Sequence, residues 1–147
     1  MSERKPTKSR SAATASLHEQ AEAAHVFAVD AARLLSDDKC QDVMVLDVQK
    51  LSQVTDFIVI ATGTSDRQMR SSLKNVEEMG ESRGHRVFRS SADERASWLL
   101  ADFVDVIVHV FEPNARAHYD REMLWGDAPR LEWERAAAAE RPPTRKR

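Results

Sequence analysis

The chain has 147 residues, of which 41% are hydrophobic, 6% aromatic and 31% charged, and this length and composition suit one globular domain. Lys and Arg number 22 and Asp and Glu number 24, so the formal net charge of -2 argues against binding to bare nucleic acid by charge alone. The single cysteine, Cys40, excludes an intrachain disulfide. No apolar run reaches the ~18–20 residues that span a bilayer, and the N-terminus lacks the apolar core of a secretory signal. We expect a cytoplasmic protein that does not associate with membranes.

Charge is distributed unevenly along the chain. Residues 1–18 and 134–147 each carry a net charge of +3, and the stretch between them is acidic. Both ends contain few large apolar side chains, and the second contains Pro142-Pro143, so we predict that both are disordered. The predicted organisation is a disordered basic tail over 1–16, an α/β domain over 17–133 and a basic C-terminal tail over 134–147.

The first elements in chain order are a helix and two strands. Apolar residues, mostly alanine, recur in steps of three and four from Leu17 to Leu35, and Ser16 with Glu19 forms a capping-box pattern, which predicts a helix over 17–36. The apolar runs at 43–48 and 57–61 are typical of strands. The second run has no polar side, which favours cover on both of its faces.

A second helix and a third strand follow. Ser65 with Gln68 is another capping-box pattern, the predicted helix runs to about Ser82, and Gly84 marks its end. Residues 86–88 then predict a short strand. A strand, a helix and a strand over this distance make a βαβ unit, so the predicted fold class is α/β.

The last predicted elements are two strands within 97–111, folded back at Phe103-Val104, and a helix that opens at Pro113 and closes at Gly126. Leu131 and Trp133 are expected to pack against the domain.

The strand pair has an aliphatic side and a mixed side. A turn centred on Phe103-Val104 sets Asp102 opposite Asp105, Leu100 opposite Ile107, and Trp98 opposite His109, whereas Leu99, Ala101, Val106 and Val108 form the aliphatic side. Two interpretations of the mixed side remain open. It is an exposed protein-binding patch if helices cover only the aliphatic side, because Trp is enriched at binding hot spots. If a helix covers this side too, Trp98 is an ordinary core residue.

Catalytic and metal-binding signals are weak. Gly63-Thr64-Ser65 before a helix could hold an anion, although a strand-to-helix turn with a cap fits better, and it lacks the P-loop lysine. Asp102 and Asp105 could hold magnesium but flank a turn. No Cys and His spacing matches a zinc site, and Cys40 has no evident activating partner, so a half-buried thiol is expected. We therefore expect a protein without cofactor or catalytic residues.

Several blocks in order resemble the ribosomal silencing factor family, also called Iojap-like, over roughly residues 22 to 133; they are Asp56–Gln68, Trp98–Asp105, Val106–Phe111, Arg116–Tyr119 and Glu122–Ala128. The resemblance implies a single domain with a mixed sheet flanked by helices, topologically similar to nucleotidyltransferases without their catalytic residues. It also implies binding to the large ribosomal subunit through protein fourteen of that subunit, which blocks subunit joining and represses translation, and a homodimer.

The family's contact surface involves the hairpin and implies a protein-binding role for Trp98, Leu100, Asp102, Asp105 and His109. The mixed side of the strand pair adds Ile107 to the expected protein-binding residues. Four positions, at three places in the chain, depart from the family pattern. Val104 stands where glycine is usual, so a turn with positive φ must be reshaped. Ser91-Ala92 replaces an acidic residue followed by glycine, and Arg121 replaces a leucine.

The leading hypothesis is a ribosome-binding repressor that acts by steric occlusion, with optional, weak contacts of the basic tails to rRNA. One alternative is a magnesium-dependent nucleotide-processing enzyme that uses Ser65, Asp102 and Asp105. The other is a self-associating module in which the mixed side forms only a dimer contact.

Overall fold

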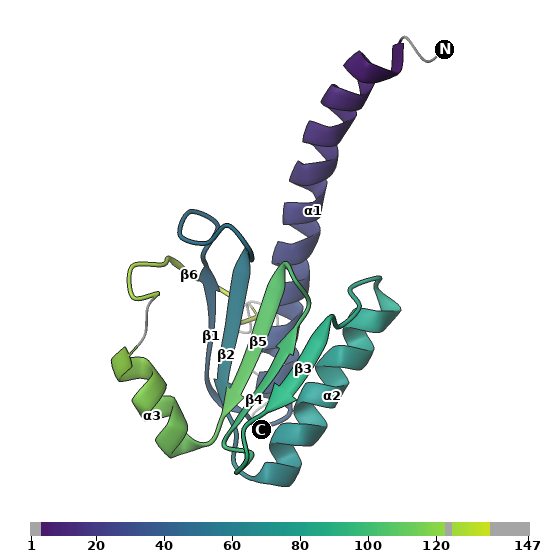
Figure 1. Ribbon diagram of the computed structural model, residues 1–147. Coiled ribbons are helices and arrows are strands. Elements are labelled where there is room, and N and C mark those ends of the chain that lie inside the picture. Colours follow the sequence, from purple (N-terminus) through teal and green to yellow (C-terminus); the bar gives the residue numbers. More distant parts are fainter. Residues whose placement is uncertain (1–3, 123–124, 136–147) are drawn as a thin grey trace, which may run out of the picture.

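The computed structural model describes residues 4–122 and 125–135, with side chains from residue 17 to 120 and from 125 to 135. The tail predicted over 134–147 therefore lies, apart from its first two residues, outside the described residues. In chain order the elements are α1 (Arg4–Asp37), β1 (Gln41–Asp47), β2 (Phe57–Thr62), α2 (Asp66–Ser82), β3 (Arg89–Ala92), β4 (Trp98–Asp102), β5 (Val106–Phe111), α3 (Pro113–Glu122) and β6 (Arg130–Leu131), as Figure 1 shows.

The strands form one mixed sheet in the order β3-β4-β5-β2-β1-β6. The central pair, β2 and β5, is parallel, and every other neighbouring pair is antiparallel. The connection from β2 through α2 enters β3, which lies at the sheet edge beyond β5 and β4. The predicted α/β class with a mixed sheet flanked by helices is confirmed. None of the described helices combines the length and the apolar character needed to cross a membrane.

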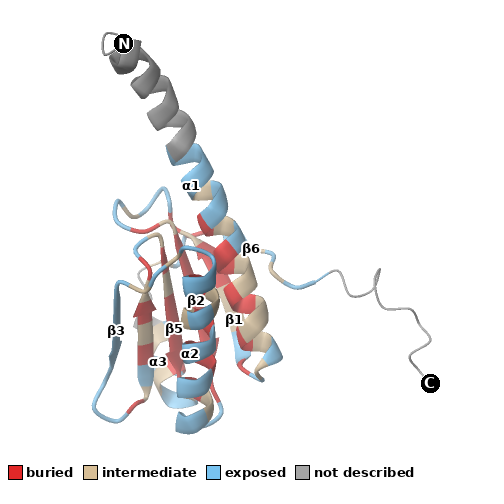
Figure 2. Ribbon diagram, turned by 90° about the vertical axis from the view of Figure 1, so that its right-hand side faces the viewer, coloured by how far each residue is buried: buried red, intermediate tan, exposed pale blue. Residues whose placement is uncertain are grey.

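Helices α1 and α2 cover one face of the sheet (Figures 1 and 2). On α1 the buried stripe is mostly alanine, from Ala24 to Ala32, with Phe27 and Leu35 as its large members. Alanine lets the helix approach the sheet closely, and Phe27 fills the remaining space against Phe103, with ring centroids 4.9 Å apart. The predicted stripe is confirmed at these positions, but Leu17 at its start is exposed.

The ends of α2 match the sequence prediction. The Ser65 hydroxyl accepts a hydrogen bond from the Gln68 N–H at 3.1 Å, which caps the first turn. At the other end, the His85 N–H donates to the Gly80 carbonyl and the Gly84 N–H donates to the Glu81 carbonyl, with Gly84 at φ +84°. This is a Schellman motif, and its left-handed position is the reason for the glycine.

Two sequence predictions about the elements are wrong, and one strand was missed. Helix α1 begins at Arg4 rather than near residue 17, so Ser16 does not cap it. The third strand is not 86–88 but β3, an edge strand that pairs on one side only and whose four residues are all exposed. Strand β6 was not predicted. The expected packing of Leu131 and Trp133 is confirmed, since both pack against the main core.

The hairpin between β4 and β5 turns one residue later than predicted. Its loop is Val104-Asp105, because the Phe103 side chain is buried in the core and its N–H donates to the Val106 carbonyl. Trp98 therefore pairs with Phe111, Leu100 with His109, and Asp102 with Ile107; Asp102 does not face Asp105. Moving the turn by one residue changes every pairing by two, so each side chain keeps its predicted face while its partner differs.

Val104 adopts the positive φ that the sequence comparison assigned to glycine, so the turn is not reshaped. Its φ is +75°, and the Asp105 N–H donates to the Phe103 carbonyl at 2.9 Å across it, which makes a γ-turn. A β-branched residue in this region is strained by about 1–3 kcal/mol.

We predict that Val104→Gly raises the free energy of unfolding by about 1 kcal/mol, because relief of strain exceeds the ~0.5–1 kcal/mol entropic cost of glycine. Urea unfolding of the wild type and the variant measures this change in the free energy of unfolding. Val54→Gly is the control: Val54 is more exposed than Val104 but is not among the described residues with positive φ, so it should lose stability. A Val104→Gly variant no more stable than Val54→Gly would show that the turn holds no strain.

Candidate docking site

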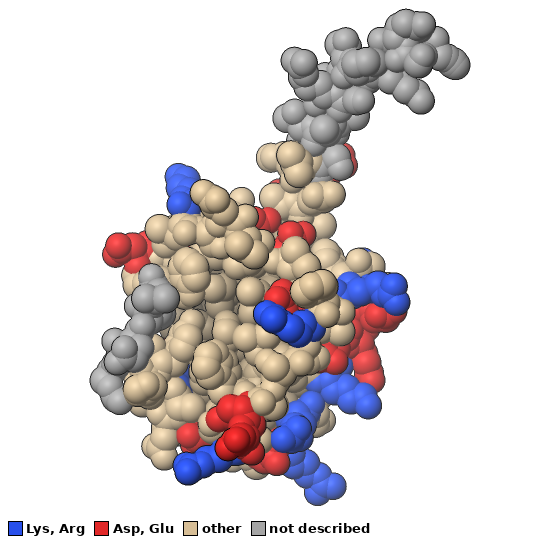
Figure 3. All heavy atoms as spheres, viewed as in Figure 1, with Lys and Arg blue, Asp and Glu red and all other residues tan. Residues whose placement is uncertain are grey.

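The second face of the sheet is covered only in part. Helix α3 and the turn at 125–128 cover the β1, β2 and C-terminal β5 portion, where Leu46, Ile58, Ile60 and Phe111 are buried. Toward β3 the face is accessible. Figure 3, which looks onto this face, shows mostly uncharged atoms, with basic and acidic atoms close to the centre and further charged side chains around the margin. The side chains of this accessible part, called the hairpin patch here, are Trp98, Leu100, Asp102 and Ile107.

Trp98 is 40% exposed, so the interpretation that a helix buries it is wrong. One side of the indole contacts a cluster of rings: it stacks on Phe111 with centroids 5.3 Å apart and meets Tyr119 of α3 edge-on. The rest of the side chain is exposed to solvent. Trp98 is therefore held in place by neighbours and accessible at the same time.

His109 holds the indole of Trp98 by a hydrogen bond. The Trp98 Nε1–H donates to His109 Nδ1 at 2.9 Å, so that nitrogen must carry no proton. Burial lowers the pKa of His109 to about 4, against a smaller opposing effect of the Asp102 charge, and the imidazole is neutral at pH 7. Because His109 is only 8% exposed, it lies beneath the hairpin patch rather than in it, unlike its expected place on the contact surface.

Asp102 and Asp105 have different surroundings. The Asp102 carboxylate accepts the Val104 N–H at 2.8 Å and lies 3.5 Å from Arg89 of β3, so it supports the turn and is partly neutralised. Asp105, in the loop, lies near Asp56 and Asp47. Burial raises the pKa of Asp56, and the charges of Asp105 and then Asp47 raise it further. This acidic margin beside the hairpin patch was only partly predicted, because Asp47 and Asp56 belong to other segments.

The residues proposed for an enzymatic alternative do not meet. Ser65 follows the C-terminal end of β2, whereas Asp105 precedes β5, whose start is paired with the start of the parallel strand β2. Six residues of strand separate these ends by roughly 15–20 Å. Across the described residues, no group of three or more His, Cys, Asp or Glu could hold a metal ion.

The turn before α2 is occupied by its own side chains. The Gln68 Oε1 accepts the Thr64 N–H at 2.8 Å, and the Gln68 Nε2 donates to the Asp38 carbonyl. Together with the Ser65 cap, these bonds favour the structural interpretation of Gly63-Thr64-Ser65.

Cys40 is buried rather than half-buried, and burial raises its thiol pKa.

The fold and its accessible face define an α/β domain with a mixed six-stranded sheet that is open on part of one side. Residues 6–147 match the family model described as "Ribosomal silencing factor during starvation". The chain belongs to this family.

Similar proteins and a similar solved structure are consistent with this family assignment. The ribosomal silencing factor RsfS of Bacillus subtilis is 35% identical over 99 residues, which cover 67% of this chain and 84% of that protein. The maize protein named Iojap, chloroplastic, is 37% identical over 107 residues, covering 72% of this chain and 46% of that protein. A crystal structure of a Chromobacterium violaceum protein, 32% identical, aligns with a TM-score of 0.63 over 80% of this chain and 94% of its own.

We predict that His109 makes folding stability fall in mild acid. Its pKa is about 4 when folded, below the ordinary value of 6.5, so between these values the unfolded chain binds the extra proton and stability drops as pH falls. The full effect is of the order of 3 kcal/mol. The measurement is urea unfolding of the wild type and His109→Gln, whose amide oxygen can accept the indole N–H, at pH 7, 5.5 and 4.5.

Carboxylates contribute equally to both proteins, so the difference between the two curves isolates the imidazole. The wild type should lose more stability than His109→Gln on acidification. Parallel curves would contradict a buried neutral histidine.

Proposed function

We propose that this chain is a ribosomal silencing factor that docks its hairpin patch on protein fourteen of the large ribosomal subunit and thereby blocks subunit joining. The observation that most supports this proposal is the environment of Trp98. Its indole is fixed by a hydrogen bond and ring contacts, yet the residue is 40% exposed. An exposed aromatic side chain among partly exposed aliphatic ones is typical of the centre of a protein interface.

Order in the free protein favours tight binding. A side chain that must be immobilised on association costs about 0.5–1.5 kcal/mol. Trp98 is already held by His109 and Phe111, so little of this cost remains. His109 thus serves the contact as a positioning residue, while Trp98, Leu100 and Ile107 supply its apolar area.

Charge supports a basic partner. Asp105 with Asp56 and Asp47 forms an acidic margin on one side of the hairpin patch. Burial and then the charges of Asp105 and Asp47 raise the Asp56 pKa, and an approaching cation relieves the repulsion among these carboxylates. Asp102 adds a carboxylate already shared with Arg89. A basic ribosomal protein fits this margin, and charge complementarity of this kind speeds association and fixes orientation.

Steric occlusion requires no catalytic group, so the proposed repressor acts without a cofactor. The homodimer, the cytoplasmic location and the weak rRNA contacts of the tails belong to the same proposal. Sedimentation equilibrium of the full chain measures the dimer, and the exposed edge strand β3 offers unpaired backbone groups to a second copy.

We predict that Trp98→Ala combined with Asp102→Lys abolishes co-sedimentation with isolated large subunits, and that Trp98→Ala alone weakens it at least tenfold, as expected for a hot-spot residue worth about 2 kcal/mol or more. The readout is the fraction of protein that pellets with large subunits, together with formation of complete ribosomes from isolated subunits.

Matched controls lie on the opposite face of the sheet. Val26→Ala trims an exposed apolar side chain of α1, and Glu81→Lys inverts an exposed acid of α2. Both should pellet like the wild type, and urea unfolding verifies that every variant is folded. If the folded double variant pellets as well as the controls, the hairpin patch is not the docking surface.

A further inference from the structure

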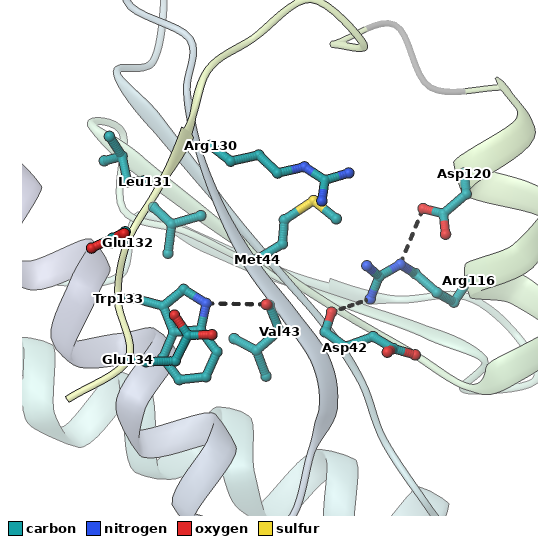
Figure 4. A pocket seen from close by; sticks show the side chains of 11 residues that line it. Asp42, Val43, Met44, Arg116, Asp120, Arg130, Leu131, Glu132, Trp133 and Glu134 are labelled. Atoms are coloured by element: carbon teal, nitrogen blue, oxygen red, sulfur yellow. Dashed lines mark hydrogen bonds and ion pairs between the residues drawn. The ribbon is translucent and has the colours of Figure 1, made fainter. Parts of the chain in front are cut away.

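A cleft of about 600 Å³ lies between β1, β6 and α3. Val43 and Met44 of β1 form its floor, and Leu131 with Trp133 and Arg116 with Asp120 line opposite sides (Figure 4). This volume is within the usual range for small-molecule sites. None of the residues that line it belongs to the hairpin patch.

Arg116 is the buried charge of this cleft. It is 5% exposed, and its Nη1 donates to the Asp42 carbonyl at 2.8 Å and to the Thr62 hydroxyl at 3.0 Å. Its Nε donates to the Asp120 carboxylate at 3.1 Å. The pairing of β1 with β2 is irregular between Gln41 and Met44, and Asp42 in this stretch has a φ of +50°. The carbonyl that accepts the Arg116 hydrogen bond belongs to this irregular stretch.

These bonds use two of the three guanidinium nitrogens. The third, Nη2, faces the cleft in Figure 4 and donates to no described residue. A guanidinium N–H that is directed into a cleft and has no protein partner can donate a charge-assisted hydrogen bond to an anionic ligand.

Arg130 supplies a second cation from the other side. Its side chain extends across Met44 toward Arg116 (Figure 4), and among the described residues it makes no hydrogen bond or ion pair. Two guanidinium groups that face the same space repel each other, and Asp120, which is about half exposed, offsets only one of them. An anion between Arg116 and Arg130 would remove this repulsion.

Glu132 and Glu134 also line the cleft, but they lie around Trp133 at the end away from the two arginines (Figure 4). Asp42 directs its main-chain oxygen, not its carboxylate, at Arg116. Both guanidinium groups therefore lie at the α3 end, where the Asp42 and Asp120 carboxylates are also found, and Asp120 pairs with Arg116; Met44 and Trp133 are apolar lining residues.

We propose that this cleft binds the phosphate group of a small phosphorylated ligand between Arg116 and Arg130, with the rest of the ligand along the apolar floor. Guanidinium groups from two elements approach a tetrahedral phosphate from different directions and bond it through several N–H groups. The inference is independent of ribosome docking, because it uses other residues.

Isothermal titration calorimetry of the full chain tests it with AMP, inorganic phosphate and adenosine as probes. We expect saturable binding of AMP at one site, weaker binding of phosphate, and no binding of adenosine. Arg130→Gln should weaken AMP binding at least tenfold, the usual effect of losing a charge-assisted hydrogen bond. Arg95→Gln, the matched control, removes an exposed arginine of the β3–β4 loop and should leave AMP binding unchanged.

Arg130 is on the surface, so its variant should fold, and urea unfolding verifies this. Co-sedimentation of Arg130→Gln with large subunits should equal that of the wild type, which separates this site from the docking surface. Absence of saturable AMP or phosphate binding at millimolar concentration would overturn the proposal. Equal affinity of Arg130→Gln and Arg95→Gln for AMP, or equal binding of adenosine and AMP, would overturn it too.

Discussion

Unequal cover of the two sheet faces is the constraint on which the rest of this structure depends. Helices α1 and α2 bury one face, whereas the other receives α3, a helix of 10 residues, and the turn after it. Such a helix is about 15 Å long, and six strands at ~4.8 Å spacing span about 24 Å. One helix of this size cannot cover the face, so the part nearest β3 stays accessible whatever its side chains are.

The ring cluster stabilises the boundary between the covered and the accessible part. Tyr119 of α3 packs on Phe111 of β5, and Trp98 is at the margin of this contact. The buried imidazole of His109 needs a hydrogen-bond partner, and the indole N–H of Trp98 supplies it. The bond works only while the imidazole is neutral, which its burial ensures at pH 7. A buried polar side chain that would be destabilising without a partner is thereby accommodated.

The sequence predicted features that depend on local patterns: the strands β2, β4 and β5, the Ser65 cap, and which side chains share each face of the hairpin. The register was wrong because it depended on whether Phe103 belonged to the turn or to the core. That choice is made by the contact of Phe103 with Phe27 of α1, far away in the chain. Asp47, Asp56 and Arg116 were missed for the same reason, since their partners lie in other elements.

Helix α3 is attached mainly by two polar side chains. Its ten residues include few large apolar ones, so burial of hydrocarbon contributes little to its position. Arg116 fixes it to the β1 and β2 backbone region through Asp42 and Thr62, and Tyr119 fixes it to the rings below Trp98. These residues are one turn apart, so the same turn of helix forms a wall of the cleft and the support of the hairpin patch. The geometry of both surfaces therefore follows from a single segment of backbone, and a shift of that segment would alter the two together.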